Sequence, residues 1–220
     1  VGDLTESQLH ARFAARVARR PMVSPTGKWP VEVLVPRKLT VRQEEEVNVG
    51  KVEFDARVFS EPKYDEVVVA YERFRERVKC KDDHFHVSCH PCDSISVDGI
   101  WEAVVELERR EGWSPDAIFI DYSDDLAPPV SGTRLEFREQ INLTWKRLRA
   151  LSQERRCLVV TATQADAGGY KKWRLDRSNF SEDKRKLANV TGMVGINMTD
   201  EEKEAGVSRL NWVVLREGGF

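Results

Sequence analysis

The sequence has few cysteines, no long apolar run and almost no net charge. Four cysteines among 220 residues are too few for a disulfide-stabilised scaffold, which predicts a reducing, cytoplasmic setting. No apolar stretch approaches the roughly 20 residues of a membrane span, and residues 1–20 are too polar for a signal peptide, so no membrane partner is expected. Because the formal charge is only −2, any nucleic-acid site must be a local basic patch.

The sequence also lacks the phosphate-binding motif G-x-x-x-x-G-K-[ST], in which backbone N–H groups and a lysine hold a nucleoside triphosphate. Gly27 and Gly50 each precede a lysine, but neither has a second glycine five positions earlier. Trp29 and Val52 stand where the motif needs serine or threonine. We therefore expect this chain alone to bind nucleotide poorly. The opening VGDL resembles the end of a strand, which suggests a truncated core from a longer parent protein.

The first 80 residues predict two helices with strands between them. Thr5 and Gln8 have the spacing of a capping box, which predicts a helix that ends near Pro21. Residues 22–62 alternate apolar and polar side chains between prolines and glycines, a pattern typical of a β-hairpin or small meander. A second helix is indicated by an apolar stripe at helical spacing, formed by Val67, Tyr71, Phe74 and Val78.

From residue 84 onward, short apolar strands alternate with amphipathic helices. This order predicts an α/β fold with a mostly parallel sheet that helices cover on both faces. Only ten residues separate the last two strands, so we expect those two to pair antiparallel. The expected strands are 85–89, 117–121, 157–164, 192–197 and 209–215, and the expected helices are 98–110, 135–155 and 181–190.

Polar side chains follow three of the expected strands. Asp121 follows AIFI, Gln164 follows VVTAT, and Asp3 follows the strand end at the start of the chain. Parallel sheets bind ligands at the carboxyl ends of their strands. A carboxylate there is costly to desolvate unless a metal ion, an arginine or a helix N-terminus lies beside it. A turn or capping acid is the alternative, but the strand ends together favour a nucleotide site where Asp121 holds Mg²⁺ through water.

The segment after Gln164, ADAGGYKKWRLDRSNF, interleaves basic and aromatic residues. Basic side chains bind phosphates, and aromatic side chains stack on bases of single-stranded DNA. An ordinary solvated loop is the alternative. The candidate DNA-binding residues are Tyr170, Lys171, Lys172, Trp173, Arg174 and Arg177.

Cysteine and histidine, the usual zinc ligands, gather in CKDDHFHVSCHPC. Their spacing, C-x₃-H-x₄-C-x₂-C, is not a standard zinc pattern. If 85–89 is a strand, Cys89 lies on its core face and His86 on the other. The pattern therefore favours a buried cysteine and surface histidines over structural zinc. The residues concerned are Cys80, His84, His86, Cys89, His90 and Cys92.

Five segments, in this order, resemble the RecA-like motor domain of DnaB-type replicative helicases and their phage or plasmid relatives. The resemblance covers residues 1–20 and about 84–220, and it implies one RecA-like ATPase core over residues 1–220 with 22–62 inserted. The segments are GDLTESQLHARFAARVARRP, SISVDGI, AIFIDYSDDL, LVVTATQADA and GINMTDEEKEAGVSRLNWVVLREGGF.

The resemblance implies ATP hydrolysis coupled to movement on single-stranded DNA by a homo-oligomeric ring, a hexamer in the relatives. Asp121 matches the Walker B aspartate that supports Mg²⁺, and Gln164 matches the sensor glutamine. Asp3 matches the acid that polarises the attacking water, although glutamate is common there. Arg216 matches the arginine that reaches a neighbouring subunit's nucleotide site. Val214 stands where the family often has a lysine.

Two other functions stay open. A chain without the phosphate-binding motif could be a non-catalytic RecA-like module that binds DNA or a protein partner. It could also belong to a regulatory or recombination ATPase that does not unwind DNA. The upstream reading frame tests the first alternative, and a strand-displacement assay tests the second.

Overall fold

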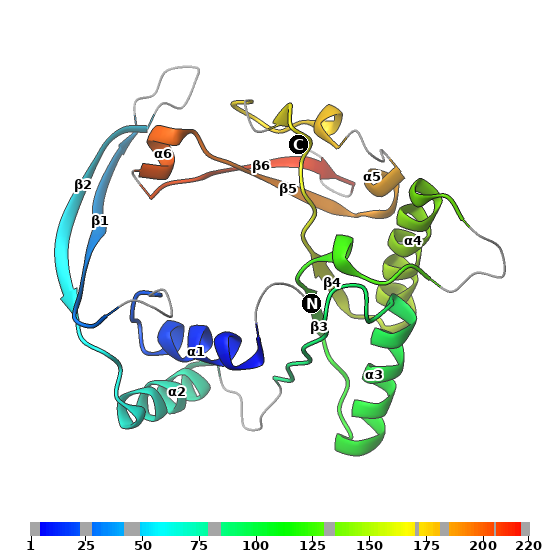
Figure 1. Cartoon of the computed structure of the whole chain (residues 1–220), viewed down its shortest axis with the longest axis horizontal. Helices are drawn as coiled ribbons and strands as arrows, with labels where there is room; N and C mark the ends of the chain where they lie inside the picture. The colour runs from blue at the N-terminus through cyan, green and yellow to red at the C-terminus, as the bar shows by residue number, and fades with distance from the viewer. Residues whose placement is uncertain are drawn as a thin grey trace. The chain divides into compact units, whose positions relative to one another are not determined.

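The computed structural model (Figure 1) describes residues 5–22, 28–41, 49–78, 85–129, 135–169, 172–180, 185–204 and 206–216. The chain divides into an N-terminal unit that ends at Ser88 and a C-terminal unit that begins at Cys89. Each unit is described by itself. Among the described residues, no helix combines the length and the apolar character needed to cross a bilayer.

The first helix, α1 (Glu6–Val17), begins at the capping box that the sequence predicts. The Thr5 hydroxyl accepts a hydrogen bond from the backbone N–H of Gln8 at 3.3 Å, and the Gln8 side chain accepts one from the Thr5 N–H at 2.9 Å. These two bonds satisfy donors that a helix start otherwise leaves unpaired. The prediction of this helix is confirmed.

The second helix, α2 (Tyr64–Val78), lies beside α1 (Figure 1). The ring of Tyr71 meets that of Phe13 edge-on, with centroids 6.2 Å apart. Arg20, just after α1, donates to Glu66 of α2 at 2.9 Å. The two helices are thus joined by one aromatic contact and one partly exposed ion pair.

A long hairpin stands between α1 and α2 in the sequence. Strand β1 (Val31–Val41) pairs antiparallel with β2 (Val49–Phe59). The register shifts between Pro36 and Lys38, where proline has no N–H to donate to the ladder. The hairpin expected within residues 22–62 is therefore present.

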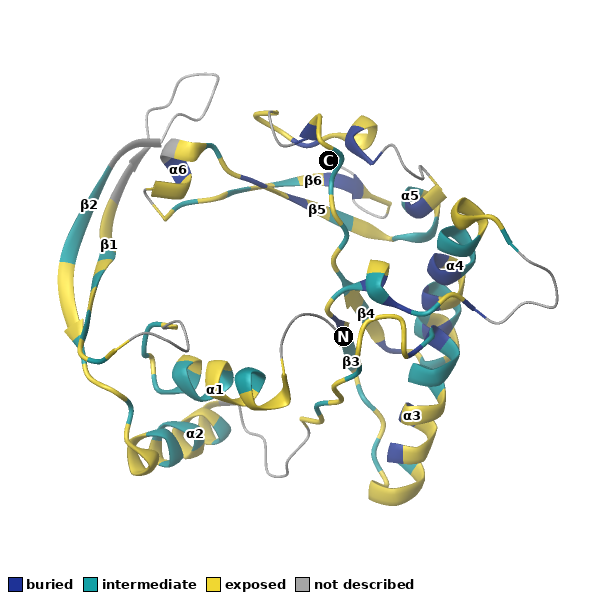
Figure 2. Cartoon of the chain, in the orientation of Figure 1, coloured by how far each residue is buried: buried dark blue, intermediate teal, exposed yellow. Residues whose placement is uncertain are grey.

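In the C-terminal unit, two helices pack against a parallel pair of strands. Helix α3 (Val97–Glu111) begins at Ser96, whose hydroxyl accepts the Gly99 N–H at 3.2 Å, and ends before Gly112 at φ 74°. Helix α4 (Phe137–Arg155) lies beside α3 (Figure 1). The core between helices and strands consists of Ile95, Val97, Ile120, Leu126, Leu148 and Leu151 (Figure 2).

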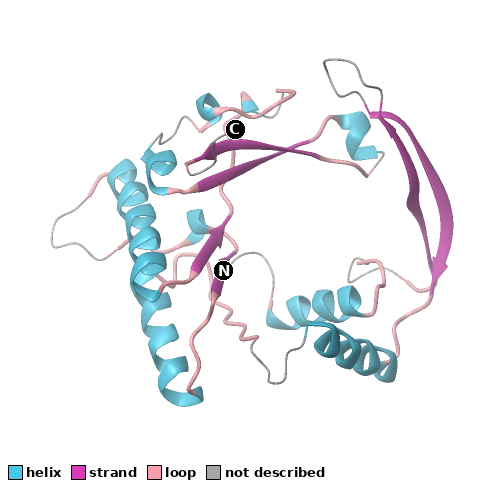
Figure 3. Ribbon diagram, turned by 180° about the vertical axis from the view of Figure 1, so that it is seen from behind, coloured by secondary structure: helices cyan, strands magenta, loops and turns pink. Residues whose placement is uncertain are grey.

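Two strand pairs belong to the C-terminal unit (Figure 3). Strand β3 (Ala117–Ile120) runs parallel to β4 (Leu158–Thr161), with α4 as their crossover. Strand β5 (Gly192–Asn197) pairs antiparallel with β6 (Arg209–Leu215), as their short connection predicts. A second core packs beside β6 and contains Leu175, Phe180, Val213 and Val214.

The outward face of β3 and β4 is open among the described residues. Phe119 is 74% exposed and Leu158 is 59% exposed, whereas the opposite face holds the core. One continuous sheet covered on both faces therefore stays a prediction.

The strand expected at residues 85–89 is wrong, because residues 85–90 have no regular structure. Phe85 stacks its ring on that of Phe13 at 5.2 Å and does not join a sheet. Cys89 is consequently exposed, so its predicted place in the core is also wrong.

The helices of the C-terminal unit differ in detail from those expected. Phe137, placed by its spacing on the inner face of α4, is 68% exposed. Helix α5 is Arg185–Asn189. A further helix, α6 (Asp200–Glu204), lies in the connection between β5 and β6, where no helix was predicted.

Candidate functional site

The carboxyl ends of β3 and β4 meet at one edge of their sheet. Ile120, the last residue of β3, pairs with Thr161, the last of β4. Asp121 follows directly after Ile120, and Gln164 follows three residues after Thr161; both are exposed. Two of the predicted site residues therefore come to the same edge, as the parallel pairing requires.

Hydrogen bonds tie together the segments that leave these two strands. The backbone N–H and the hydroxyl of Ser123 both donate to the carbonyl of Ala162, at 3.4 and 3.2 Å. The hydroxyl of Thr163 donates to Asp124 Oδ2 at 2.7 Å. The loop after Asp121 is thus fixed to the strand that leads to Gln164.

A buried lysine completes this connection. Lys186 of α5 is 6% exposed, and its Nζ donates to Asp124 Oδ1 and to Thr163 Oγ1, each at 2.9 Å. The ammonium also lies 5.8 Å from the centre of the Trp145 ring, within range of a cation–π contact. Sequence reasoning missed Lys186 and Thr163, because no local pattern connects residues so far apart in the chain.

A cavity of about 500 Å³ lies at this edge of the sheet. Gln164, Asp124 and Lys186 contribute polar groups to its lining. A cavity of this size that mixes aromatic walls with a few polar groups is typical of small-molecule sites. Its aromatic lining consists of Tyr122, Phe137, Trp145 and Phe180.

Asp121 suits the Mg²⁺ role that the sequence assigns to it. Its exposed position leaves the carboxylate open to a hydrated cation. Mg²⁺ in nucleotide sites keeps several waters and takes one or two protein carboxylates beside the phosphates. No three Cys, His, Asp or Glu side chains converge within the described part of the chain. The residues present thus fit a cation shared with a nucleotide, which supplies further ligands.

Arg216, at the end of β6, is bonded within its own chain. Its Nη2 donates to the carbonyls of Leu187 and Ala188 at 3.2 and 2.6 Å. These carbonyls belong to the end of α5, where unpaired oxygens favour a cation. To reach a neighbouring subunit, the guanidinium must leave these two carbonyls.

The basic loop after Gln164 is partly neutralised. Lys172 Nζ donates to Asp176 at 2.8 Å and to Ser178 at 3.0 Å. The hydrogen bond from Lys172, with those from Ser178, holds the pKa of Asp176 well below its ordinary value. Arg174 and Arg177 are exposed and form no ion pair with any residue that the structure describes.

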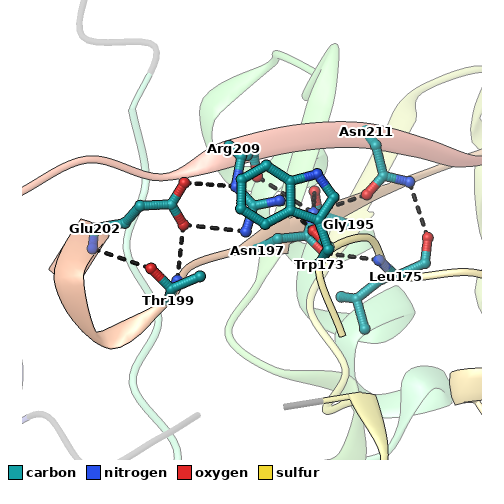
Figure 4. A network of polar contacts seen from close by, with 8 residues as sticks. All are labelled: Trp173, Leu175, Gly195, Asn197, Thr199, Glu202, Arg209 and Asn211. Atoms are coloured by element: carbon teal, nitrogen blue, oxygen red, sulfur yellow. Dashed lines mark hydrogen bonds and ion pairs between the residues drawn. The ribbon is translucent and has the colours of Figure 1, made fainter. Parts of the chain in front are cut away.

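Trp173, in the same loop, is held by β6. The guanidinium carbon of Arg209 lies 3.4 Å from the centre of its ring (Figure 4). Trp173 is nevertheless 37% exposed. Sequence reasoning missed Arg209 and its partner Glu202, although Thr199 and Glu202 have capping-box spacing, a signal that also predicts α6.

Several predicted residues lie outside the described part of the chain. These include Asp3 of the nucleotide site, and Tyr170 and Lys171 of the basic loop. Cys80 and His84 of the possible zinc group also lie there, so the disfavoured zinc site stays untested.

No protein-family model matches the chain, and no curated protein matches it either. Two solved structures are similar to it. The ATPase domain of a DnaB-like helicase has a TM-score of 0.54 at 13% identity, over 71% of this chain and 54% of that one. A DnaB-like replicative helicase, solved in a study of its interactions with primase, has a TM-score of 0.54 at 15% identity, over 73% and 38%.

The chain therefore has the RecA-like fold of DnaB-type helicase ATPase domains. The resemblance inferred from the sequence is confirmed at the level of fold. The chain spans about half the length of the first of these structures and less than two fifths of the second.

Proposed function

We propose that this chain is the core of an ATP-dependent helicase motor that moves on single-stranded DNA. One observation carries the proposal. In a fold shared with DnaB-type ATPase domains, the parallel pairing of β3 with β4 brings Asp121 and Gln164 to the same sheet edge. An acid and a neutral amide on adjacent strand ends can respectively support Mg²⁺ and respond to the γ-phosphate.

Each predicted residue has a role in this proposal. Asp121 supports Mg²⁺, which neutralises charge on the phosphates when bound. Asp3 polarises the attacking water, and Gln164 reports the state of the nucleotide to the loop that follows it. Arg216 acts on the nucleotide of a neighbouring subunit in a ring, once released from the end of α5.

The chain by itself is proposed to be inactive. It contains no G-x-x-x-x-G-K-[ST] motif, so the groups that cradle a triphosphate are missing from these residues. The activity is proposed for a parent protein that supplies this motif.

ATP turnover tests the proposal. The protein is the longest natural reading frame that contains this chain, assayed with and without single-stranded DNA. We expect DNA-stimulated turnover that Asp121→Asn abolishes. The matched control is Asp116→Asn, because Asp116 is an exposed aspartate at the opposite end of the same strand. Absence of turnover from a parent that contains the phosphate-binding motif would overturn the motor function.

A second function is favoured by the missing motif alone. If the natural protein has no phosphate-binding motif, the chain is a non-catalytic RecA-like module that binds DNA or a partner. Single-stranded DNA binding that ATP and Mg²⁺ do not change, together with no turnover, is then expected.

A further inference from the structure

Trp173 is fixed in place by contacts on its ring and on its backbone. Arg209 lies over one face of the indole, with 3.4 Å between the guanidinium carbon and the ring centre. The same guanidinium donates a hydrogen bond to the backbone carbonyl of Trp173. Figure 4 shows Arg209 between Trp173 and Glu202. One arginine thus holds both the ring and the main chain of this loop residue.

Arg209 is in turn held by a buried carboxylate. Its Nε and Nη2 donate to the two oxygens of Glu202, at 2.6 and 3.0 Å, and the Glu202 side chain is only 5% exposed. Glu202 also accepts from the Thr199 N–H at 2.7 Å, while its own N–H donates to the Thr199 hydroxyl at 3.2 Å. A planar guanidinium in this two-point grip has one orientation, which sets the plane of the indole above it.

The main chain beyond Trp173 is anchored as well. The Leu175 N–H donates to Asn197 at 2.7 Å, and Asn211 donates to the Leu175 carbonyl at 2.9 Å. Asn197 and Asn211 bond to each other at 2.7 Å. Gly195 permits this close approach, because a Cβ there would lie 3.0 Å from the Leu175 side chain. The loop is thus pinned to β5 and β6 two residues after Trp173.

The surroundings of Trp173 suit a nucleotide. The indole is 37% exposed although Arg209 covers one face. Arg174 and Arg177 are exposed nearby in the chain, whereas the charge of Lys172 is taken up by Asp176. An oriented aromatic ring with cations close by in the same loop offers a base-stacking surface and phosphate contacts together.

We propose that Trp173 is a preformed stacking site for one base of a single-stranded nucleic acid, and that Arg209, held by Glu202, is the residue that positions it. This inference rests on the proposed function, because it requires that the loop contact DNA. It goes further in assigning the base contact to one residue and in explaining why an ion pair lies behind that residue. A site oriented in advance loses less freedom on binding than a mobile side chain does.

The test compares two DNA strands that differ only in their bases. Fluorescence anisotropy measures binding of the full chain to an oligothymidylate and to an abasic strand of equal length, at several salt concentrations. We expect the chain to prefer the oligothymidylate by about 5- to 100-fold, the range of one base–aromatic stack. Trp173→Ala should remove most of that preference. Arg209→Lys and Glu202→Gln should reduce it several-fold and leave binding of the abasic strand unchanged.

Arg177→Ala is the matched control, because it removes an arginine of the same loop that does not hold the indole. We expect it to weaken binding of both strands equally and to lower the salt dependence by about one phosphate contact. Circular dichroism melting of each variant checks folding. Because Glu202→Gln retains the side chain's size, it replaces Arg209→Lys if that variant does not fold.

The outcomes separate this inference from the function on which it rests. Equal binding of the two strands by the unmodified chain overturns the stacking site and leaves the DNA interface standing. Binding of neither strand overturns the DNA interface itself. Parallel loss for both strands in Arg209→Lys and in Glu202→Gln makes the ion pair a structural support only, which contradicts the positioning role.

Discussion

The N-terminal and C-terminal units differ in how much of each is buried. Every buried hydrophobic side chain that the structure describes lies in the C-terminal unit, from Ile95 onward. Among residues 5–22, 28–38, 52–77 and 85–88, none is buried (Figure 2). Leu34 and Val58, on the hairpin, are 62% and 68% exposed. The same chain thus contains one unit with a core and one whose described elements have none.

This difference shows which forces hold the candidate site. The N-terminal elements form from contacts within a few residues or between two strands, and an isolated two-stranded hairpin is only marginally stable. In the C-terminal unit, the loop after β3, the end of β4 and α5 are joined by Asp124, Thr163 and Lys186. The candidate functional residues therefore lie on the unit that has long-range packing, where side chains can be held in fixed positions.

The largest expected effect comes from removing the same side chain from each unit. Leu151→Ala should lower the free energy of unfolding by about 2–5 kcal/mol, because Leu151 is fully buried and truncation leaves a cavity. Leu34→Ala should change it by less than about 1 kcal/mol, because this strand position is mostly exposed. Urea denaturation of both variants measures the contrast. Equal losses would mean that the hairpin is buried in solution.

The next contrast replaces one cation in each unit by methionine. Lys186→Met leaves Asp124 and Thr163 without their donor, and we expect a loss of about 1–3 kcal/mol. Arg20→Met breaks the more exposed pair with Glu66 and should cost about 0–1 kcal/mol. Adding Asp124→Asn to Lys186→Met should recover part of the loss. An unchanged urea midpoint for Lys186→Met would show that the buried bond adds no stability.

Acid should separate the two units through their paired carboxylates. The hydrogen bond from Arg209 lowers the pKa of Glu202 below its ordinary value of 4.5, so the folded protein favours the charged form. The stability from this pair is complete above about pH 4.5 and is lost as the pH falls through the lowered pKa. The difference in stability between the unmodified protein and Glu202→Gln should therefore shrink in acid.

Glu66→Gln is the control for the acid experiment. Arg20 also lowers the pKa of Glu66, but the Glu66 side chain is 46% exposed, so water screens the pair. Its pH dependence should be weaker than that of Glu202→Gln. Urea midpoints from neutral pH down to about pH 3 test the contrast, and the reverse order would contradict it.

Local patterns in the sequence predict much of this structure. The capping box at Thr5 and Gln8, the hairpin within 22–62 and the order of β3, α4 and β4 all follow from short-range signals. The pairing of β3 with β4 then follows from the parallel order, and it brings Asp121 and Gln164 together.

Two kinds of feature could not be predicted. Alternation over only five residues does not distinguish a strand from a loop, and Phe85 stacks on Phe13 instead of extending a sheet. The bonds of Lys186 to Asp124 and of Arg209 to the backbone of Trp173 join distant segments that only the folded chain brings together. Burial and ion pairing of this kind leave no periodic signal.

The smallest expected effect again compares one arginine from each unit. Arg37, on the hairpin, is 65% exposed and lies 3.8 Å from both Glu53 and Asp55. Arg37→Ala should change stability by less than about 0.5 kcal/mol, and the change should vanish near 1 M salt, where charges are screened beyond about 3 Å. Arg155, bonded to Glu108 between α4 and α3, is 21% exposed, so Arg155→Ala should cost more and respond less to salt. If Arg37→Ala cost as much as Arg155→Ala at every salt concentration, the hairpin's ion pairs would be shielded from solvent, and the contrast between a unit with a core and one without would fail.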